Sequence, residues 1–142
     1  MPDIIKIYTF CAAHQYHNPV WDDEKNYMVF GDDVRVHGHN YELKVTVGGP
    51  IDPGSGFIIN LAELNKAVQD KIIAVLDHSQ IEKDIPWFKG KQPSTEYLTI
   101  FIWDNLVEHI PPPAFLKRIR IKETPTIYTE YFGPQGENND PR

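Results

Sequence analysis

The chain has 142 residues, of which 41% are hydrophobic and 12% aromatic, and its formal net charge is −6. This length suits one domain with a hydrophobic core, and the negative charge argues against a nucleic-acid partner, since phosphate binding depends on Lys and Arg. No apolar run is long enough to span a bilayer and no signal peptide is recognisable, so we expect no membrane partner. The single cysteine excludes an intrachain disulfide and favours a cytoplasmic location.

Two strands are predicted in the first third of the chain. The run from Ile4 to Ala13 is rich in β-branched and aromatic residues and predicts the first strand. Residues 15 to 36 contain a proline, a glycine and a charged cluster, which predict a long loop, and such a loop in a compact domain is often functional. The run from His37 to Val47 predicts the second strand, which ends at Gly48-Gly49-Pro50.

Two helices are predicted next, after a short strand at residues 56 to 59. The first helix begins after its N-cap Asn60 and ends near Leu76. Its apolar residues fall on one stripe, formed by Leu61, Leu64, Val68, Ile72 and Val75. The second helix begins at Pro93-Ser94 and ends at the three prolines 111 to 113. Its predicted buried face consists of Leu98, Phe101, Ile102 and Leu106.

Two further strands, from Leu116 to Thr124 and from Thr126 to Phe132, form a predicted hairpin around Pro125. The order β-β-α-α-β-β does not interleave strands with helices, so we predict an α+β fold with a four-stranded antiparallel sheet and two helices on one face. The uncovered edges of such a sheet favour oligomerisation. We expect one domain over residues 1–132 and a flexible C-terminal tail over residues 133–142, which are polar and rich in Gly and Pro.

The pattern His37-Gly38-His39 starts the second predicted strand. Side chains alternate faces along a strand, so the two histidines point the same way. His14, at the end of the first strand, is the candidate third ligand, and three neutral imidazoles match a catalytic zinc site that keeps one position for water or substrate. The spacing alone leaves open that all three are exposed histidines at strand ends. Because the chain has no pair of cysteines, a closed structural zinc site is not expected.

Glu123 is a carboxylate on an apolar strand face. It shares this face with Ile119 and Ile121, where a charge is costly unless it is paired or hydrogen-bonded. One interpretation is an acceptor for a guanidine-like ligand edge, which offers two parallel N–H donors to one carboxylate. The alternative is a glutamate at the strand end that reaches solvent.

Asp77 and His78 directly follow the first predicted helix. Histidine is the commonest general acid or base, and an adjacent acid can orient it or stabilise its charge. The alternative is that Asp77 is solvated and His78 only helps to end the helix. Cys11 is predicted to be a small buried residue on the face opposite to His14, and His17 is predicted to lie on the surface.

Together these residues resemble the 6-pyruvoyltetrahydropterin synthase family, which includes the bacterial 6-carboxytetrahydropterin synthases of the queuosine pathway. Six matching segments run in family order through most of the chain. They are Phe10-Cys11-Ala12-Ala13-His14, His37-Gly38-His39-Asn40-Tyr41, Gly56-Phe57-Ile58-Ile59-Asn60, Leu76-Asp77-His78, Pro93-Ser94-Thr95-Glu96-Tyr97 and Glu123-Thr124. No segment is specific by itself, but six in this order are.

The resemblance implies a tunnelling fold that assembles as a homo-oligomer, either a trimer or a hexamer. It implies a Zn²⁺ cofactor on the three histidines and a pterin substrate held by Glu123. The further residues that it implies at the substrate site are Thr124, Ser94, Thr95 and Glu96. Asp77 and His78 would assist proton transfer across a subunit boundary.

The loop before His37 departs from the family pattern. Synthases of the family use a cysteine base there, whereas this chain has Asp33 at that position, with Asp32 as a substitute if the loop is shifted by one residue. Reference pKa values are about 8.5 for a thiol and about 3.9 for Asp, so an unperturbed Asp is a poorer base by about 6 kcal/mol. Burial raises the pKa of a carboxyl by several units and would recover part of this difference.

The sequence therefore predicts a zinc-dependent lyase in which Asp33, Asp77 and His78 are catalytic. The expected reaction converts 7,8-dihydroneopterin triphosphate to a 6-pyruvoyl- or 6-carboxy-tetrahydropterin. A first alternative is cleavage of the pterin side chain to 6-hydroxymethyl-dihydropterin with Asp33 in place of cysteine, since a branch of the family carries Glu at this position. A second alternative is a pterin-binding homologue without the reaction, and a third is a structural or interaction protein with neither ligand.

Overall fold

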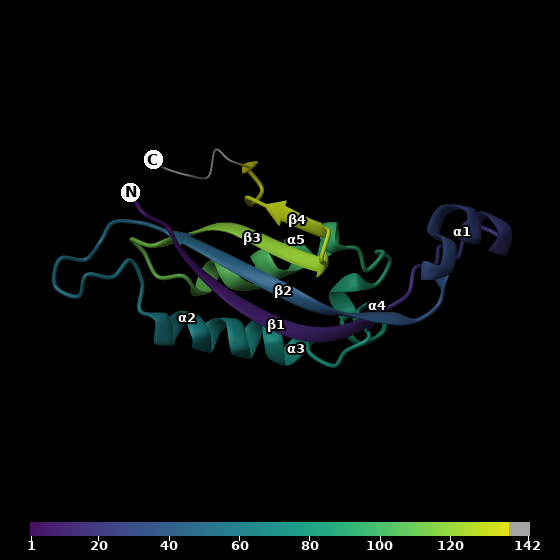
Figure 1. The fold of residues 1–142 in the computed structure, drawn as a ribbon, viewed down its shortest axis with the longest axis horizontal. Helices are drawn as coiled ribbons and strands as arrows, with labels where there is room; N and C mark the ends of the chain where they lie inside the picture. The colour runs from purple at the N-terminus through teal and green to yellow at the C-terminus, as the bar shows by residue number, and fades with distance from the viewer. Residues whose placement is uncertain (137–142) are drawn as a thin grey trace.

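A computed structural model describes residues 1–136 and contains one four-stranded antiparallel sheet in the order β1-β2-β3-β4. The strands are β1 Ile4–His14, β2 His37–Gly48, β3 Phe115–Thr124 and β4 Ile127–Tyr131. The sheet is long and twisted, and the main helices run along one of its faces (Figure 1). The predicted α+β fold, its antiparallel sheet and the order of its main elements are confirmed.

The pairing of β1 with β2 brings the ends of these two strands together. The register runs from Ile4 opposite Val47 to His14 opposite His37. Along the second half of β1 the even-numbered residues from Tyr8 to His14 are buried and the odd-numbered ones are more exposed. One face of the sheet therefore packs on the helices, and His14 stands at the end of that face.

Two helical segments cover the buried face of the sheet (Figure 1). The first runs without a break through α2 Leu61–Val68, a π-helical segment Gln69–Ile73 and α3 Ala74–Leu76, and the second is α5 Thr95–Leu106. Asn60 and Ser94 cap them and accept hydrogen bonds from the backbone N–H groups of Ala62 and Tyr97. Both predicted helices are confirmed, as is the predicted N-cap Asn60, and the structure shows Ser94 as the N-cap of the second.

The hydrophobic core lies between the sheet and these helices. The predicted core residues Leu64, Val68, Ile72, Leu98, Phe101, Ile102 and Leu106 are buried. Leu61 and Val75 are exposed, so the predicted stripe is wrong at its two ends. Val75 follows the π-helical segment, whose wider turn changes the direction of the residues after it, and Leu61 lies in the first turn of α2.

Residues 15 to 36 do not form the irregular loop that the sequence predicts. They contain α1 Asp23–Phe30 and a 3-10 turn Gly31–Val34. Asp22 caps α1 by accepting a hydrogen bond from the N–H of Lys25 at 2.8 Å, and two acids lie in the first turn, where the helix dipole favours negative charge. The charged cluster that suggests a loop thus also starts a helix. In Figure 1, α1 projects beyond the sheet at the end where β1 finishes and β2 begins.

The connections between the main elements differ from the prediction in two further ways. The prediction of a short strand at residues 56 to 59 is wrong, because this segment is irregular and Gly56 has a φ of 79°. Two short helical segments are additional, namely α4 Ile81–Asp84 and the 3-10 turn Pro86–Phe88, and the last turn of the second predicted helix, Val107–His109, is a 3-10 turn.

The segment after α3 covers part of the free edge of β1. The N–H of His78 donates to the carbonyl of Cys11 at 2.6 Å, and the N–H of Ala13 donates to the carbonyl of Ser79 at 2.8 Å. His78 has a φ of 63°, in the left-handed region that few non-glycine residues adopt. Cys11 lies on the face opposite to His14 as predicted, but it is exposed, because the helices pack on the other face.

Residues 137–142 of the predicted flexible tail lie outside the described residues, so the flexibility of residues 133–142 stays a prediction. Within the described part, a hydrogen bond from the N–H of Gly136 to the carbonyl of Gly133 forms a turn. Over residues 1–136, none of the helices has the length and apolar character needed to cross a membrane.

Candidate metal centre and active site

His14, His37 and His39 converge at the end of the helix-facing side of the sheet. The register places His14 directly opposite His37, and His39 follows two residues later on the same face of β2. The ring centroid of His14 is 4.5 Å from that of His37 and 5.1 Å from that of His39. One nitrogen of each ring lies within 4.8 Å of the other two. The predicted triad is therefore brought together.

Two backbone carbonyls orient the rings of this triad. The carbonyl of Pro93 lies 2.9 Å from Nδ1 of His14, and the carbonyl of Arg35 lies 2.8 Å from Nδ1 of His37. Because a carbonyl oxygen only accepts, each Nδ1 carries a proton, and in the neutral form of each ring Nε2 then presents a lone pair. The two Nε2 atoms are 2.9 Å apart. Two lone pairs at this distance repel each other unless a cation lies between them.

The histidine set fits a metal ion on two further observations. The Nε2 of His39 is buried and, although Glu123 Oε1 lies 3.2 Å away, makes no hydrogen bond with residues 1–136. A buried nitrogen whose hydrogen bond is not made is costly unless a ligand satisfies it. Burial, together with the neighbouring His37 and His39, lowers the pKa of His14 from 6.5 to about 4. The ring is thus neutral at pH 7, which is the form that binds a metal.

Two carboxylates border the triad. Asp33 Oδ1 lies 3.6 Å from Nε2 of His37, and Glu123 Oε1 lies 3.2 Å from Nε2 of His39. The Asp33 side chain is 59% exposed, whereas that of Glu123 is 16% exposed. Burial raises the pKa of Glu123, and Asp33 and Glu96 raise it further, while His39 and His37 act in the opposite direction. Glu123 therefore does not escape into solvent at the strand end.

The start of α5 lies beside the same site. Ser94 uses its hydroxyl as the helix cap, and Thr95 donates a hydrogen bond to Glu96 at 2.9 Å and contacts Thr129 at 2.7 Å. Glu96 is near enough to Glu123 to raise the pKa of the latter. On the neighbouring strand end, Thr124 accepts a hydrogen bond from the N–H of Thr126 at 3.4 Å. Thr95 and Glu96 thus lie at the site, while the hydroxyls of Ser94 and Thr124 are bound to backbone.

Asp77 and His78 form a pair of their own. Asp77 Oδ2 lies 2.9 Å from Nδ1 of His78, and Asp77 Oδ1 accepts a hydrogen bond from the N–H of Cys11 at 2.9 Å. The bond from Cys11, followed by that from His78, lowers the pKa of Asp77. The His78 side chain is 82% exposed. The pair is held at the edge of β1 beside Cys11, whereas His14 points to the helix-facing side.

Two tyrosines at the site are missing from the sequence-based prediction. Tyr41 is buried and its hydroxyl lies 3.4 Å from Nδ1 of His14. Alternation along the strand places Tyr41 on the same face as His37 and His39, and this is the sequence signal that could have identified Tyr41 as a site residue. The ring of Tyr16 lies 5.1 Å from that of His14. Burial and the nearby Glu123 raise the pKa of Tyr16, so its hydroxyl is neutral at pH 7.

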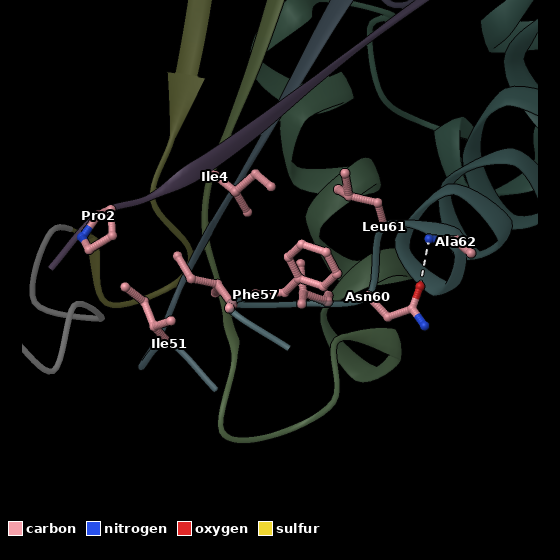
Figure 2. A pocket seen from close by; sticks show the side chains of 10 residues that line it. Pro2, Ile4, Ile51, Phe57, Asn60, Leu61 and Ala62 are labelled. Carbon is pink, nitrogen blue, oxygen red and sulfur yellow. Dashed lines mark hydrogen bonds between the residues drawn. The ribbon is translucent and has the colours of Figure 1, made fainter. Parts of the chain in front are cut away.

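An apolar cavity of about 370 Å³ lies at the other end of the sheet (Figure 2). Its walls include Pro2, Ile4, Phe57 and Leu61, and none of its lining side chains is titratable. Ile4 and His14 are ten residues apart on β1, which corresponds to about 33 Å of strand. This cavity therefore has no part in the chemistry of the histidine site.

The sequence matches the family described as 6-pyruvoyl tetrahydropterin synthase over residues 3–134. The chain is 39% identical over 128 residues to the 6-pyruvoyl tetrahydrobiopterin synthase of Drosophila melanogaster, covering 89% of this chain and 76% of that protein. It is 36% identical over 127 residues to the Homo sapiens protein of the same name, covering 88% and 87%. A solved structure of the Caenorhabditis elegans 6-pyruvoyl tetrahydropterin synthase superposes with a TM-score of 0.85 at 32% identity, over 94% of this chain and 97% of that one.

The match covers nearly the whole chain, and the relatives share both its sequence and its fold. The sheet order, the helix-covered face and the convergent histidines are the features that the resemblance predicts. The chain belongs to the 6-pyruvoyl tetrahydropterin synthase family, and its fold is the tunnelling fold.

Proposed function

We propose that the protein is a zinc-dependent lyase that converts 7,8-dihydroneopterin triphosphate to a 6-pyruvoyl- or 6-carboxy-tetrahydropterin. The observation that carries this proposal is the convergence of three histidine rings at one point bordered by the carboxylates of Asp33 and Glu123. The names of the Drosophila and human relatives favour the 6-pyruvoyl product. For that product the substrate loses triphosphate and transfers electrons from its side chain to its ring, so no external oxidant or reductant is needed.

His14, His37 and His39 would hold the zinc ion. Three neutral imidazoles leave a fourth position for substrate oxygen, as in catalytic zinc sites. A zinc ion bound there supplies Lewis acidity to the hydroxyls of the substrate side chain and acidifies the neighbouring C–H and O–H bonds. The carbonyls of Pro93 and Arg35 keep the rings of His14 and His37 in the tautomer that this requires.

Glu123 would hold the pterin ring. The ring carries a guanidine-like edge with parallel N–H donors, and a single carboxylate accepts two of them in a bidentate arrangement. The low exposure of Glu123 supports this role, because hydrogen bonds to a partly buried carboxylate compete less with water. Thr95, Glu96, Ser94 and Thr124 are proposed to line the same substrate site.

Asp33 would remove a proton from the substrate side chain. Its carboxylate borders the triad 3.6 Å from Nε2 of His37, in the region where a substrate bound to the metal would present its side chain. Asp77 and His78 would assist proton transfer. Because this pair lies at the edge of β1 and not beside its own triad, we propose that it serves the site of a neighbouring copy in a trimer or hexamer.

The replacement of the family cysteine by Asp33 favours a second candidate. A carboxylate at this position matches the branch of the family that cleaves the pterin side chain to 6-hydroxymethyl-dihydropterin. A pterin-binding homologue without turnover is the remaining ligand-based alternative. A cytoplasmic location remains the expectation from the single cysteine.

The decisive experiment is product identification. The zinc-loaded protein is incubated with 7,8-dihydroneopterin triphosphate, and the pterins and the released triphosphate are analysed by chromatography and mass spectrometry. A 6-pyruvoyl or 6-carboxy product supports the proposal, and 6-hydroxymethyl-dihydropterin supports the second candidate. Pterin binding without any product would leave the non-catalytic homologue. Absence of stoichiometric zinc after loading would overturn all ligand-based hypotheses.

A further inference from the structure

The carboxylate of Asp33 is not fixed by hydrogen bonds of its own. Its side chain is 59% exposed, and its separation of 3.6 Å from Nε2 of His37 exceeds hydrogen-bond distance. Within residues 1–136 no donor forms a hydrogen bond with this carboxylate. The position of the acid relative to the triad is therefore set by the backbone of the 3-10 turn Gly31–Val34 that carries it.

This turn belongs to an arm, which we define as residues 15–36. In Figure 1 the helix of this arm stands apart from the sheet and its covering helices. Inside the arm Asn26 is 2% exposed and accepts a hydrogen bond from the N–H of Asn18 at 2.7 Å. Its amide also donates to the carbonyls of Asn18, Trp21 and Asp22. The arm thus has its own internal hydrogen-bond network, and its placement depends on how it is joined to the sheet.

Gln15 and His17 join the arm to the body through hydrogen bonds with Glu82 and Gln92. Tyr16 is the residue that joins the metal-site strand to the turn that carries Asp33. Its backbone N–H donates to the carbonyl of Asp33 at 2.9 Å. Its ring stacks on Phe30, with centroids 5.3 Å apart and planes 24° apart, and Phe30 in turn stacks on Trp21 at 5.9 Å. The same ring lies 5.1 Å from that of His14, at the end of β1. One residue therefore contacts both the metal-site strand and the arm that carries Asp33.

We propose that Tyr16 is a positioning residue that holds Asp33 beside the metal centre. It acts through its backbone hydrogen bond to Asp33 and through the stack of its ring on Phe30. This inference rests on the proposed function, in which Asp33 is the base. In this role the aromatic ring of Tyr16 is required and its hydroxyl is not, so a phenylalanine is expected to serve as well, whereas an aliphatic side chain is not.

The effect on turnover follows from the geometry of proton transfer. A general base works within about 2.6–3.2 Å of the proton that it removes, and a misplacement of about 1 Å costs up to about 100-fold in rate. Loss of the stack moves the base without removing a metal ligand or the pterin anchor. The expected signature is a lower kcat at nearly constant KM and constant metal content.

The test compares Tyr16→Leu and Tyr16→Phe with Tyr27→Leu. Tyr27 is an exposed tyrosine of α1 in the same arm and provides the matched control. Tyr16→Leu is expected to lower kcat by about tenfold or more with KM and zinc content within about twofold of wild type. Tyr16→Phe and Tyr27→Leu are expected to stay within about threefold. A kcat near wild type in Tyr16→Leu, or a parallel loss of zinc, overturns the proposal.

A second measurement needs no turnover. Hydrogen exchange of the backbone amide of residue 16 reports its bond to the carbonyl of Asp33 directly. We expect exchange at this amide to accelerate by about tenfold or more in Tyr16→Leu and to stay unchanged in Tyr16→Phe. Equal protection in both variants contradicts the positioning role. If wild type proves inactive while Tyr16→Leu still loses protection, the proposed function fails and the connection between Tyr16 and Asp33 stands.

Discussion

Glu123 Oε1 lies 3.2 Å from Nε2 of His39, across the pairing of β2 with β3. The proposed pterin anchor and one proposed metal ligand are therefore direct neighbours. In the proposed complex, a substrate whose ring lies on the carboxylate would have its side chain close to the triad. The same proximity means that a cation at the triad stabilises the charged form of Glu123, which burial otherwise disfavours.

Replacement of Glu123 by Gln or Ala is expected to weaken pterin binding much more than zinc binding. The carboxylate accepts two charge-assisted hydrogen bonds in the proposed complex, worth about 1.5–3 kcal/mol, so the dissociation constant of a pterin rises by about 10- to 100-fold. Titration calorimetry with a dihydropterin and metal analysis of the same samples provide the measurements. Equal losses of pterin and zinc would indicate a damaged fold instead of a lost anchor.

The triad itself predicts the metal content of single variants. Wild type is expected to bind one zinc ion per chain, and His37→Ala is expected to bind none at a stoichiometric metal concentration, because two imidazoles do not complete the site. His17→Ala is the matched control, since His17 is an exposed histidine of the same region. Elemental analysis after dialysis distinguishes them. Zinc retained by His37→Ala would exclude that residue as a ligand.

Asp33→Ala is expected to abolish turnover, with a loss of at least about 100-fold in kcat, which is the usual range for a general base. Zinc content should not change, since Asp33 is outside the set of three histidines whose nitrogens converge. Asp32→Ala is the control, because Asp32 is the adjacent acid of the same turn. Turnover of Asp33→Ala at the wild-type rate removes Asp33 from the mechanism, and a loss confined to Asp32→Ala transfers the role to Asp32.

The burial of His14 predicts how the metal-free protein responds to acid. The folded pKa of about 4 lies below the unfolded value of 6.5, so between these values the unfolded chain binds more protons and stability falls as pH falls. At pH 5 the loss relative to pH 7.5 is about 2 kcal/mol. Urea unfolding of chelator-treated protein at the two pH values measures it. His14→Gln should show a flatter dependence, and an equally steep one would assign the effect to other groups.

The separate placement of Asp77 and His78 predicts complementation between chains. Asp33→Ala and His78→Ala should each be inactive as pure proteins. If the pair serves a neighbouring copy, subunits unfolded and reassembled as an equal mixture should regain up to about a quarter of the wild-type activity, because about one site in four combines an intact Asp33 with an intact Asp77–His78 pair. Activity assays before and after mixing provide the measurement. No gain on mixing, in assemblies that mass spectrometry shows to be mixed, contradicts the shared site.

The sheet and the triad could be predicted because both follow from the alternation of side chains between the two faces of a strand, which repeats every two residues. Alternation along His37-Gly38-His39 places two rings on one face, and His14 stands at the end of the neighbouring strand. The same alternation places Glu123 on the buried face. The capping signal at Asn60 and the start at Pro93-Ser94, each followed by an apolar stripe, predict both main helices.

The arm could not be predicted in the same way. Met28 and Val29 of α1 are exposed, Phe30 is half-buried at its end, and its buried residue is the polar Asn26. A helix that buries no apolar stripe has no periodic pattern to find. The carbonyls of Pro93 and Arg35 are also invisible to sequence reasoning, because every residue carries a carbonyl and only the fold decides which one faces a histidine.

The segment that folds back at His78 covers only one end of the outer edge of β1, so the two ends of this edge differ in whether their backbone groups are already hydrogen-bonded. Near its end the edge is occupied by hydrogen bonds to residues 78 and 79. Among residues 1–136, the part from Ile4 to Phe10, about 23 Å long, stays at the outer edge of the sheet, where a strand from another chain would pair in the proposed oligomer. In the proposed oligomer, a strand added at this edge would have to end where Asp77 and His78 begin. These two residues would therefore limit the length of the added strand, and they would lie at the boundary between the two chains.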